Sequence, residues 1–102
     1  MPKKIKYSLA CVETILEITD YIIFHYKAPL TGLRFSEKLQ QYIEDIAKHP
    51  ELYPHNQHES LRKYGSENMR ISNFQKKWVI LFEVEDNFVI IQKIIHAGKI
   101  ID

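Results

Sequence analysis

Two short apolar runs form the centre of this sequence: Trp78-Val79-Ile80-Leu81-Phe82-Glu83-Val84 and, after the acidic break Glu85-Asp86-Asn87, Phe88-Val89-Ile90-Ile91-Gln92-Lys93-Ile94-Ile95. Both runs are rich in β-branched and aromatic residues, which is typical of the two strands of an antiparallel hairpin. In the first run, alternate residues from Trp78 to Val84 share one face, and Val79 and Leu81 on the other face are also apolar. A strand that is apolar on both faces usually lies inside a sheet, so the rest of the chain must cover it.

The first half of the chain predicts a short strand and two helices. Residues 4–9 alternate between polar and apolar side chains, as in a strand, and Ser8 is suited to cap the helix that follows. That helix is expected over residues 11–26. A second helix opens at Pro29 and runs from Leu30 to Lys48, where His49-Pro50 ends it. The residues expected on the buried faces of the two helices are Val12, Ile15, Leu16, Ile18, Ile22, Ile23, Leu33, Phe35, Leu39, Tyr42, Ile43 and Ile46.

The second half predicts an exposed polar loop over residues 51–65, a third strand over residues 68–74 and a turn at residues 75–77. The predicted fold is α+β: an N-terminal strand, a two-helix hairpin and then a three-stranded antiparallel meander forming one small sheet. The two helices leave enough chain for the first strand to pair in parallel with a later one. We expect the hairpin to cover one sheet face and the other face to be a shallow concavity, partly apolar and partly basic. All 102 residues fit one domain.

The overall composition is that of an ordinary globular domain, and a local basic patch could still exist within it. A hydrophobic content of 45% and a charged content of 26% are ordinary for a globular domain, and the net charge of +1 is below the basic excess usual in nucleic-acid-binding proteins. Cys11 is the only cysteine, so no internal disulfide is possible, and a reducing compartment, the cytoplasm, is expected. Cys11 itself is expected to be a small core residue. No apolar run approaches the roughly 20 residues that a membrane-spanning helix needs.

Side chains capable of chemistry are few and scattered. His55 and His58, with His49 nearby, lack the second ligand pair of a zinc site, and three glycines are too few for a phosphate-binding loop. No metal or cofactor is therefore expected. His96, at the end of the last strand, suits either a general acid or base or a cap on a backbone carbonyl. The basic residues of the second half either converge on the open sheet face or form an ordinary solvated surface; they are Arg62, Lys63, Arg70, Lys76, Lys77, Lys93 and Lys99.

Several motifs, taken in their order and spacing, resemble one known family. They are Tyr7-Ser8 with Ala10, Ile18-Thr19-Asp20-Tyr21-Ile22, Pro29 with Arg34-Phe35, His49-Pro50-Glu51-Leu52-Tyr53-Pro54, Arg70, Val79-Ile80-Leu81-Phe82-Glu83-Val84, and Ile94-Ile95-His96 with Lys99. Over nearly the whole chain, they resemble the RelE/ParE superfamily of toxins from bacterial type II toxin–antitoxin modules.

Two mechanisms occur in that superfamily: RelE-like members cut messenger RNA in the ribosomal decoding site, and ParE-like members inhibit DNA gyrase. RelE-like ribonucleases generally carry an arginine at the start of the central strand, where this chain has Val79, and valine cannot stabilise developing negative charge. The long helical hairpin also looks ParE-like. The resemblance therefore implies a ParE-like gyrase inhibitor without catalytic residues.

Two alternatives stay open. The first is a ribosome-dependent mRNA endonuclease, in which Arg70, His96 and Lys99, with Lys76 or Lys77, would supply the acid–base and charge-stabilising groups. The second is a superfamily member without toxicity.

The resemblance also implies a cognate antitoxin. Antitoxins usually lay an extended or helical segment over the toxin, which buries apolar surface and neutralises basic residues. The candidate surfaces are the exposed edge of the sheet, the ridge of the helical hairpin and a groove holding Ile100 and Ile101. Operator DNA would be contacted only through the antitoxin.

Overall fold

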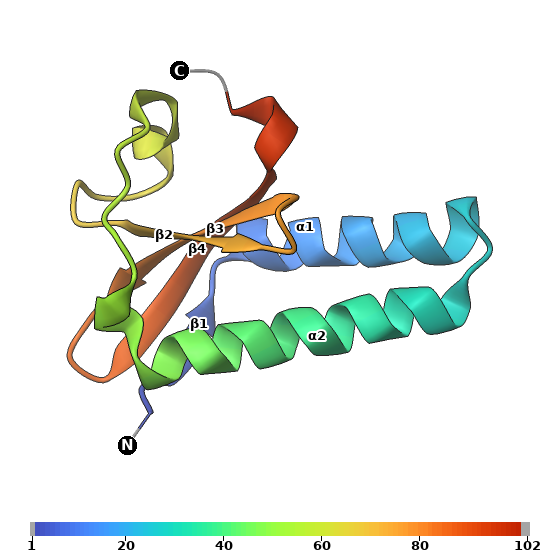
Figure 1. The fold of residues 1–102 in the computed structure, drawn as a ribbon, viewed down its shortest axis with the longest axis horizontal. Coiled ribbons are helices and arrows are strands. Elements are labelled where there is room, and N and C mark those ends of the chain that lie inside the picture. Colours follow the sequence, from blue (N-terminus) through green and yellow to red (C-terminus); the bar gives the residue numbers. More distant parts are fainter. Residues whose placement is uncertain (1, 101–102) are drawn as a thin grey trace.

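The computed structural model describes residues 2–100 as a four-stranded sheet with a helical hairpin on one face (Figure 1). The elements are β1 (Lys4–Tyr7), α1 (Leu9–Asp20), α2 (Pro29–Lys48), β2 (Arg70–Phe74), β3 (Trp78–Val84) and β4 (Phe88–His96). The sheet order is β1-β4-β3-β2; β1 runs parallel to β4, and the other neighbours are antiparallel.

The α+β class, the N-terminal strand and the antiparallel run of β2, β3 and β4 are confirmed. The description of the sheet as a three-stranded meander is corrected, because β1 joins it as a fourth strand and makes it mixed. Parallel pairing is possible because the two helices between β1 and the later strands supply the long crossover that it requires.

The central strand β3 has one buried core on each of its faces, as its alternation predicts. Ile80 and Phe82 point to the main core, together with Phe35, Leu39 and Ile43 of α2. Val79 and Leu81 point to a second, smaller cluster, which also holds Leu61, Met69 and Ile95.

The helical hairpin starts from a side-chain cap. The Ser8 hydroxyl accepts a hydrogen bond from the Cys11 backbone N–H at 3.0 Å, as expected for a helix N-cap. After Asp20, α1 continues as a single π-helical turn, η1 (Tyr21–His25). Pro29 lies in the first turn of α2, and the helix ends at Lys48, as predicted. The far end of the hairpin extends beyond the sheet (Figure 1).

Three residues predicted to face the core are exposed instead: Val12 and Leu16 on α1 and Leu33 on α2. The physical reason is the small size of the sheet, which covers one side of each helix and ends before the tip of the hairpin. Apolar residues outside that contact stay on the surface. Leu9, placed in the strand by its alternation, begins α1 and is 74% exposed.

The segment between α2 and β2 is more ordered than the predicted loop. It contains two 3₁₀ turns, η2 (Pro50–Leu52) and η3 (Glu59–Tyr64), and it buries Leu61 in the second cluster. The sheet face expected to be open is therefore partly covered. Ile100 also packs against this cluster, whereas the prediction for Ile101 lies outside the described residues.

Glu83 ties this covering segment to the sheet. One carboxylate oxygen accepts the Ser66 backbone N–H at 2.5 Å, and the other accepts the Gln92 side-chain N–H at 3.0 Å. Desolvation on its own would raise the pKa of Glu83, but these hydrogen bonds outweigh it and hold the pKa below its ordinary value.

Candidate functional site

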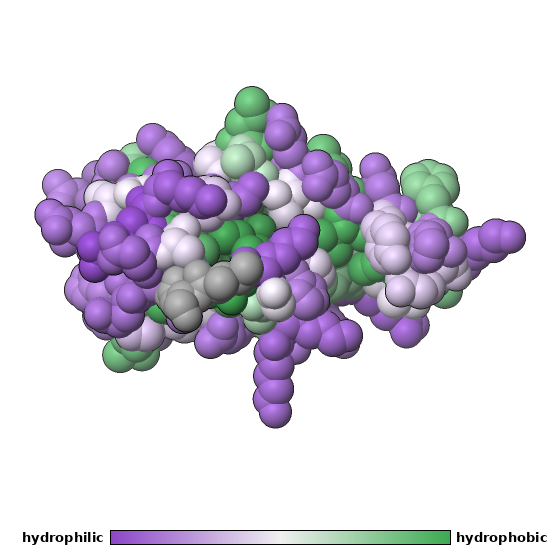
Figure 2. All heavy atoms as spheres, turned by 90° about the horizontal axis from the view of Figure 1, so that it is seen from above, coloured by the Kyte–Doolittle hydropathy of each residue, from purple (hydrophilic) through white to green (hydrophobic). Residues whose placement is uncertain are grey.

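Two adjoining grooves lie where α1 passes the end of β4. The first, of about 630 Å³, runs between α1, β4 and η3, and the second, of about 840 Å³, runs between the helical hairpin and the β2–β3 turn. Glu17, Ile18, Trp78, His96 and Lys99 line both grooves, so the two form one continuous depression. Seen from above, the middle of this face of the molecule is hydrophobic and hydrophilic side chains border it (Figure 2).

We call this depression the basic groove, because its charged lining is almost entirely positive. Its lysines and arginines are Arg34, Lys38, Lys63, Lys77, Lys93 and Lys99. Against these six cations stands one carboxylate, Glu17, so the groove carries a formal charge of +5 while the whole chain carries +1. Within residues 2–100, none of the six forms an ion pair.

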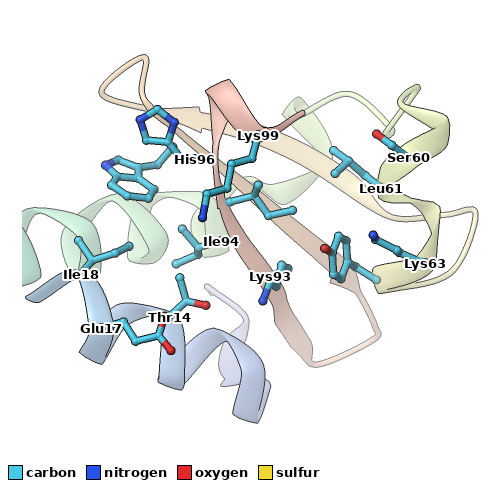
Figure 3. A pocket seen from close by; sticks show the side chains of 13 residues that line it. Thr14, Glu17, Ile18, Ser60, Leu61, Lys63, Lys93, Ile94, His96 and Lys99 are labelled. Atoms are coloured by element: carbon cyan, nitrogen blue, oxygen red, sulfur yellow. The ribbon is translucent and has the colours of Figure 1, made fainter. Parts of the chain in front are cut away.

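His96 and Lys99 meet in this groove. His96 closes β4 opposite Trp78, and their rings meet edge to face with centroids 5.2 Å apart. Lys99 belongs to the 3₁₀ turn η4 (Ala97–Lys99), and its side chain points into the groove towards Ile94 and α1 (Figure 3).

A backbone hydrogen bond fixes how His96 presents its ring. Nδ1 accepts the Gly98 N–H at 3.0 Å, so the neutral ring carries its proton on Nε2. Nε2, the ring nitrogen left for a ligand, is then a hydrogen-bond donor whether the ring is neutral or positively charged. His96 can donate a proton or a hydrogen bond from this position, but it cannot act there as a base.

Lys93 and Lys63 flank an aromatic ring at the other end of the groove. Their ammonium groups lie 5.6 Å and 5.2 Å from the centre of the Tyr64 ring, within cation–π range. Lys93 is half-buried on β4, and Lys63 and Tyr64 belong to η3. The sequence pointed to Lys63, Lys77, Lys93 and Lys99 as cations that could converge. It did not place Arg34 and Lys38 in this set, because the periodicity of α2 predicts its buried face and not where its cations meet those of other elements.

Arg70 does not join His96 and Lys99. It lies opposite Phe82 on β3, whereas His96 lies opposite Trp78. The backbones of Arg70 and His96 are therefore separated by four residues along β3, about 13 Å, and by two strand spacings, about 10 Å. The Arg70 guanidinium instead donates a hydrogen bond to the Tyr53 carbonyl at 2.6 Å and holds the covering segment in place.

A separate apolar groove lies between α1 and α2, beside the end of β1. Its volume is about 270 Å³, and its lining is Tyr7, Val12, Ile15, Leu16, Ser36, Leu39, Gln40 and Ile43. Val12 and Leu16, which the sequence placed in the core, form its exposed wall.

The histidines of the covering segment do not assemble a metal site. Across residues 2–100, no group of three or more His, Cys, Asp or Glu side chains is placed to hold a metal ion. His55 pairs through its backbone with Arg70. Over the same part of the chain, neither α1 nor α2 is long and apolar enough to cross a membrane.

Comparison with known proteins gives the family. The family model described as "ParE toxin of type II toxin-antitoxin system, parDE" matches residues 5–101. Among solved structures, the fold is similar to a chain of the "Chromosomal ParDE TA system from P. aeruginosa", with a TM-score of 0.71 and 12% sequence identity over 92% of this chain and 95% of that chain. No curated protein matches. Because the family model covers nearly all of the sequence, this chain belongs to the family of ParE toxins of type II toxin–antitoxin systems.

Proposed function

We propose that this ParE toxin inhibits DNA gyrase in the cytoplasm and that a cognate antitoxin neutralises it. The observation that carries the proposal is the family match over residues 5–101. The geometry of the basic groove supports the proposal, because the groove does not bring together the catalytic residues that an mRNA endonuclease of the superfamily would need.

The nuclease alternative loses Arg70 from its catalytic set. Attack by a ribose 2′-hydroxyl needs a base within about 3 Å, a cation at the phosphorane and an acid at the leaving oxygen. Arg70 lies opposite Phe82, at the other end of β3 from the Trp78–His96 pair. Its guanidinium donates a hydrogen bond to the Tyr53 backbone carbonyl. Val79, at the position where the nucleases carry arginine, is 3% exposed inside the second cluster. The basic residues that line the groove with His96 are Lys99, Lys93 and Lys77. These side chains are hydrogen-bond donors, and none of them supplies a base.

The tip of the helical hairpin is the candidate contact with gyrase. Tyr21, Phe24 and Tyr26 are 52%, 73% and 65% exposed there. The rings of Tyr21 and His25 stack at 4.5 Å, and Tyr26 meets both edge to face, so three rings form one rigid unit. Exposed aromatic residues held rigidly on a projecting element are typical anchors of protein interfaces.

The apolar groove of the hairpin is the candidate seat of the antitoxin. Val12 and Leu16 on α1 and Leu39 and Ile43 on α2 line a trough that suits the apolar face of an amphipathic helix. The outer edge of β1 suits an added strand, whereas the covering segment already pairs with the start of β2. Operator DNA would then be bound by the antitoxin rather than by this chain.

One pair of assays tests the target. Purified protein is added to gyrase with relaxed plasmid and ATP and, separately, to ribosomes translating an end-labelled message. We expect supercoiling to stop while the message stays intact. Cleavage of the message at codon positions, with supercoiling unchanged, would refute the proposal.

Variants connect each activity to its surface. Phe24→Ala should raise the toxin concentration for half-inhibition of gyrase at least tenfold, and Leu52→Ala, equally exposed on another surface, serves as the matched control.

Arg70→Ala and His96→Ala should leave growth arrest unchanged. Leu16→Asp should weaken antitoxin binding at least tenfold, whereas Leu52→Asp should not. A small acidic protein encoded immediately upstream is the expected antitoxin.

A further inference from the structure

The basic groove shares Tyr21 and Tyr26 with the tip of the hairpin, but its six cations have no role in the contacts proposed above. Gyrase is assigned to the tip of the hairpin and the antitoxin to the apolar groove, while the six cations lie between α1, α2, η3 and the ends of β3 and β4. We propose that the basic groove binds a single strand of nucleic acid, with phosphates on the lysines and a base against Trp78.

Charge is the first argument. The groove has six cations and a single opposing carboxylate, and none of these six cations forms an ion pair within residues 2–100. The protein itself therefore does not neutralise this concentration of positive charge. Because the chain as a whole carries only +1, the groove's +5 leaves the remaining surface at −4. A polyanion is therefore attracted to this face and repelled by the others.

The shape of the groove is the second argument. Cations follow it from Lys63 and Lys93 at one end, through Lys99 in the middle, to Arg34 and Lys38 at the other end. Figure 3 shows the first half, with Lys63, Lys93 and Lys99 set around one opening and Glu17 facing them from α1. An elongated track of cations matches the repeating phosphates of a strand better than it matches one small anion.

The aromatic lining favours a nucleic acid over an acidic peptide. Trp78 is half-buried midway along the groove, where it lines both halves, and His96 beside it presents a donor at Nε2. Single-strand-binding proteins combine such cations with aromatic rings on which bases stack, at about 1–3 kcal/mol per base. A chain of carboxylates would use the cations and leave the tryptophan unused.

The groove lies between elements that stand on both sides of it, which suits one strand better than a duplex.

The sole tryptophan provides the readout. Trp78 is the only tryptophan of the chain, so a base that stacks on it quenches the intrinsic fluorescence directly. The probes are a 12-nucleotide single strand as RNA and as DNA, the same sequence as a duplex, and a polyglutamate peptide of equal charge. We expect micromolar binding of the single strand at 50 mM salt with quenching. If about four phosphates are held, the affinity should fall about 50-fold between 50 and 200 mM salt.

A charge-matched pair of variants locates the site. Lys93→Gln with Lys99→Gln should weaken binding of the strand at least tenfold and halve the salt slope. Lys4→Gln with Lys48→Gln makes the same change of charge outside the groove and should leave both quantities nearly unchanged. Thermal unfolding of each variant checks that its fold is intact.

The proposal is overturned by several results. They are an absence of binding at 50 mM salt, an equal loss in the two double variants, tighter binding of the duplex or the peptide than of the single strand, and binding without quenching. These measurements use neither gyrase nor ribosomes, so a failure to bind the strand leaves the proposed inhibition of gyrase untouched.

Discussion

Gly32 lets the two helices of the hairpin approach closely, and replacing it tests that packing. A Cβ atom built at Gly32 would lie 2.6 Å from Ile23 Cγ1 and 3.4 Å from the Thr19 carbonyl oxygen. Carbon atoms pack at about 3.5–4.0 Å, so the Ile23 side chain would have to move by about 1 Å. Overpacking of this kind costs about 1–3 kcal/mol, and the better helix propensity of alanine returns up to about 1 kcal/mol. Gly32→Ala should therefore destabilise the protein by about 1 kcal/mol.

The sign of this effect should reverse when Ile23 is shortened. Ile23→Ala removes Cγ1 and, because the side chain is only half-buried, should itself cost about 1–2 kcal/mol. In that background Gly32→Ala meets only the ordinary 3.4 Å contact and should stabilise the protein by up to about 1 kcal/mol. The coupling energy between the two sites should then be about 1–3 kcal/mol.

Urea unfolding followed by Trp78 fluorescence and circular dichroism measures all four proteins of this cycle. Thr31→Ala, exposed in the same turn, is the control for propensity alone and should be slightly stabilising. The reasoning about close approach is refuted if Gly32→Ala has the same effect with and without Ile23.

Three further results are expected. The folded-state pKa of Glu83 is lowered, so its carboxylate stabilises the fold above the unfolded pKa of about 4.3, and this effect is lost as pH falls through the folded value. Glu83→Gln should therefore lower the free energy of unfolding at pH 7, and below pH 3 its unfolding free energy in urea titrations should approach that of the wild type. Burial raises the pKa of the Cys11 thiol to about 11, so a thiol reagent at pH 8 should label it only after urea unfolding, and labelling of the folded protein at the rate of free cysteine would contradict this. Tyr42→Phe removes hydrogen bonds to the Ser72 hydroxyl and, at 2.8 Å, to the Asn73 carbonyl, and should cost about 1–2 kcal/mol of unfolding free energy; an unchanged midpoint would show that these bonds contribute nothing.

The local elements of this protein could be predicted from its sequence because their signals are local. The alternation from Trp78 to Val84 placed β3 in the interior of the sheet with a core on each face, and Ser8 and Pro29 marked helix starts through the cap and the fixed φ of proline. The polar residues 75–77 interrupt the apolar pattern between β2 and β3, which predicts the turn there. Gln75 and Lys76 adopt the positive φ angles that a tight hairpin turn requires.

The extent of burial depended on the tertiary structure. Periodicity gives the apolar residues of a helix but not which of them a sheet will cover. It therefore predicts a buried position for Val12, Leu16 and Leu33, whose side chains are exposed, whereas Cys11 next to Val12 is fully buried. The composition of the covering segment predicts an exposed polar loop, although Leu61 is buried in the second cluster and hydrogen bonds with Glu83 and Arg70 hold the segment to the sheet.

Patterns along the chain were enough to predict the α+β class, the order of the elements, the family and the set of basic residues. Which of these residues meet depends on the folded arrangement: Lys63 and Lys99 come together with Arg34 in one groove, and Arg70 is excluded from it. The physical reason is register. Residues from a helix, a turn and a strand end become neighbours only when the β2–β3–β4 pairing is fixed, and that pairing places Arg70 opposite Phe82 and His96 opposite Trp78.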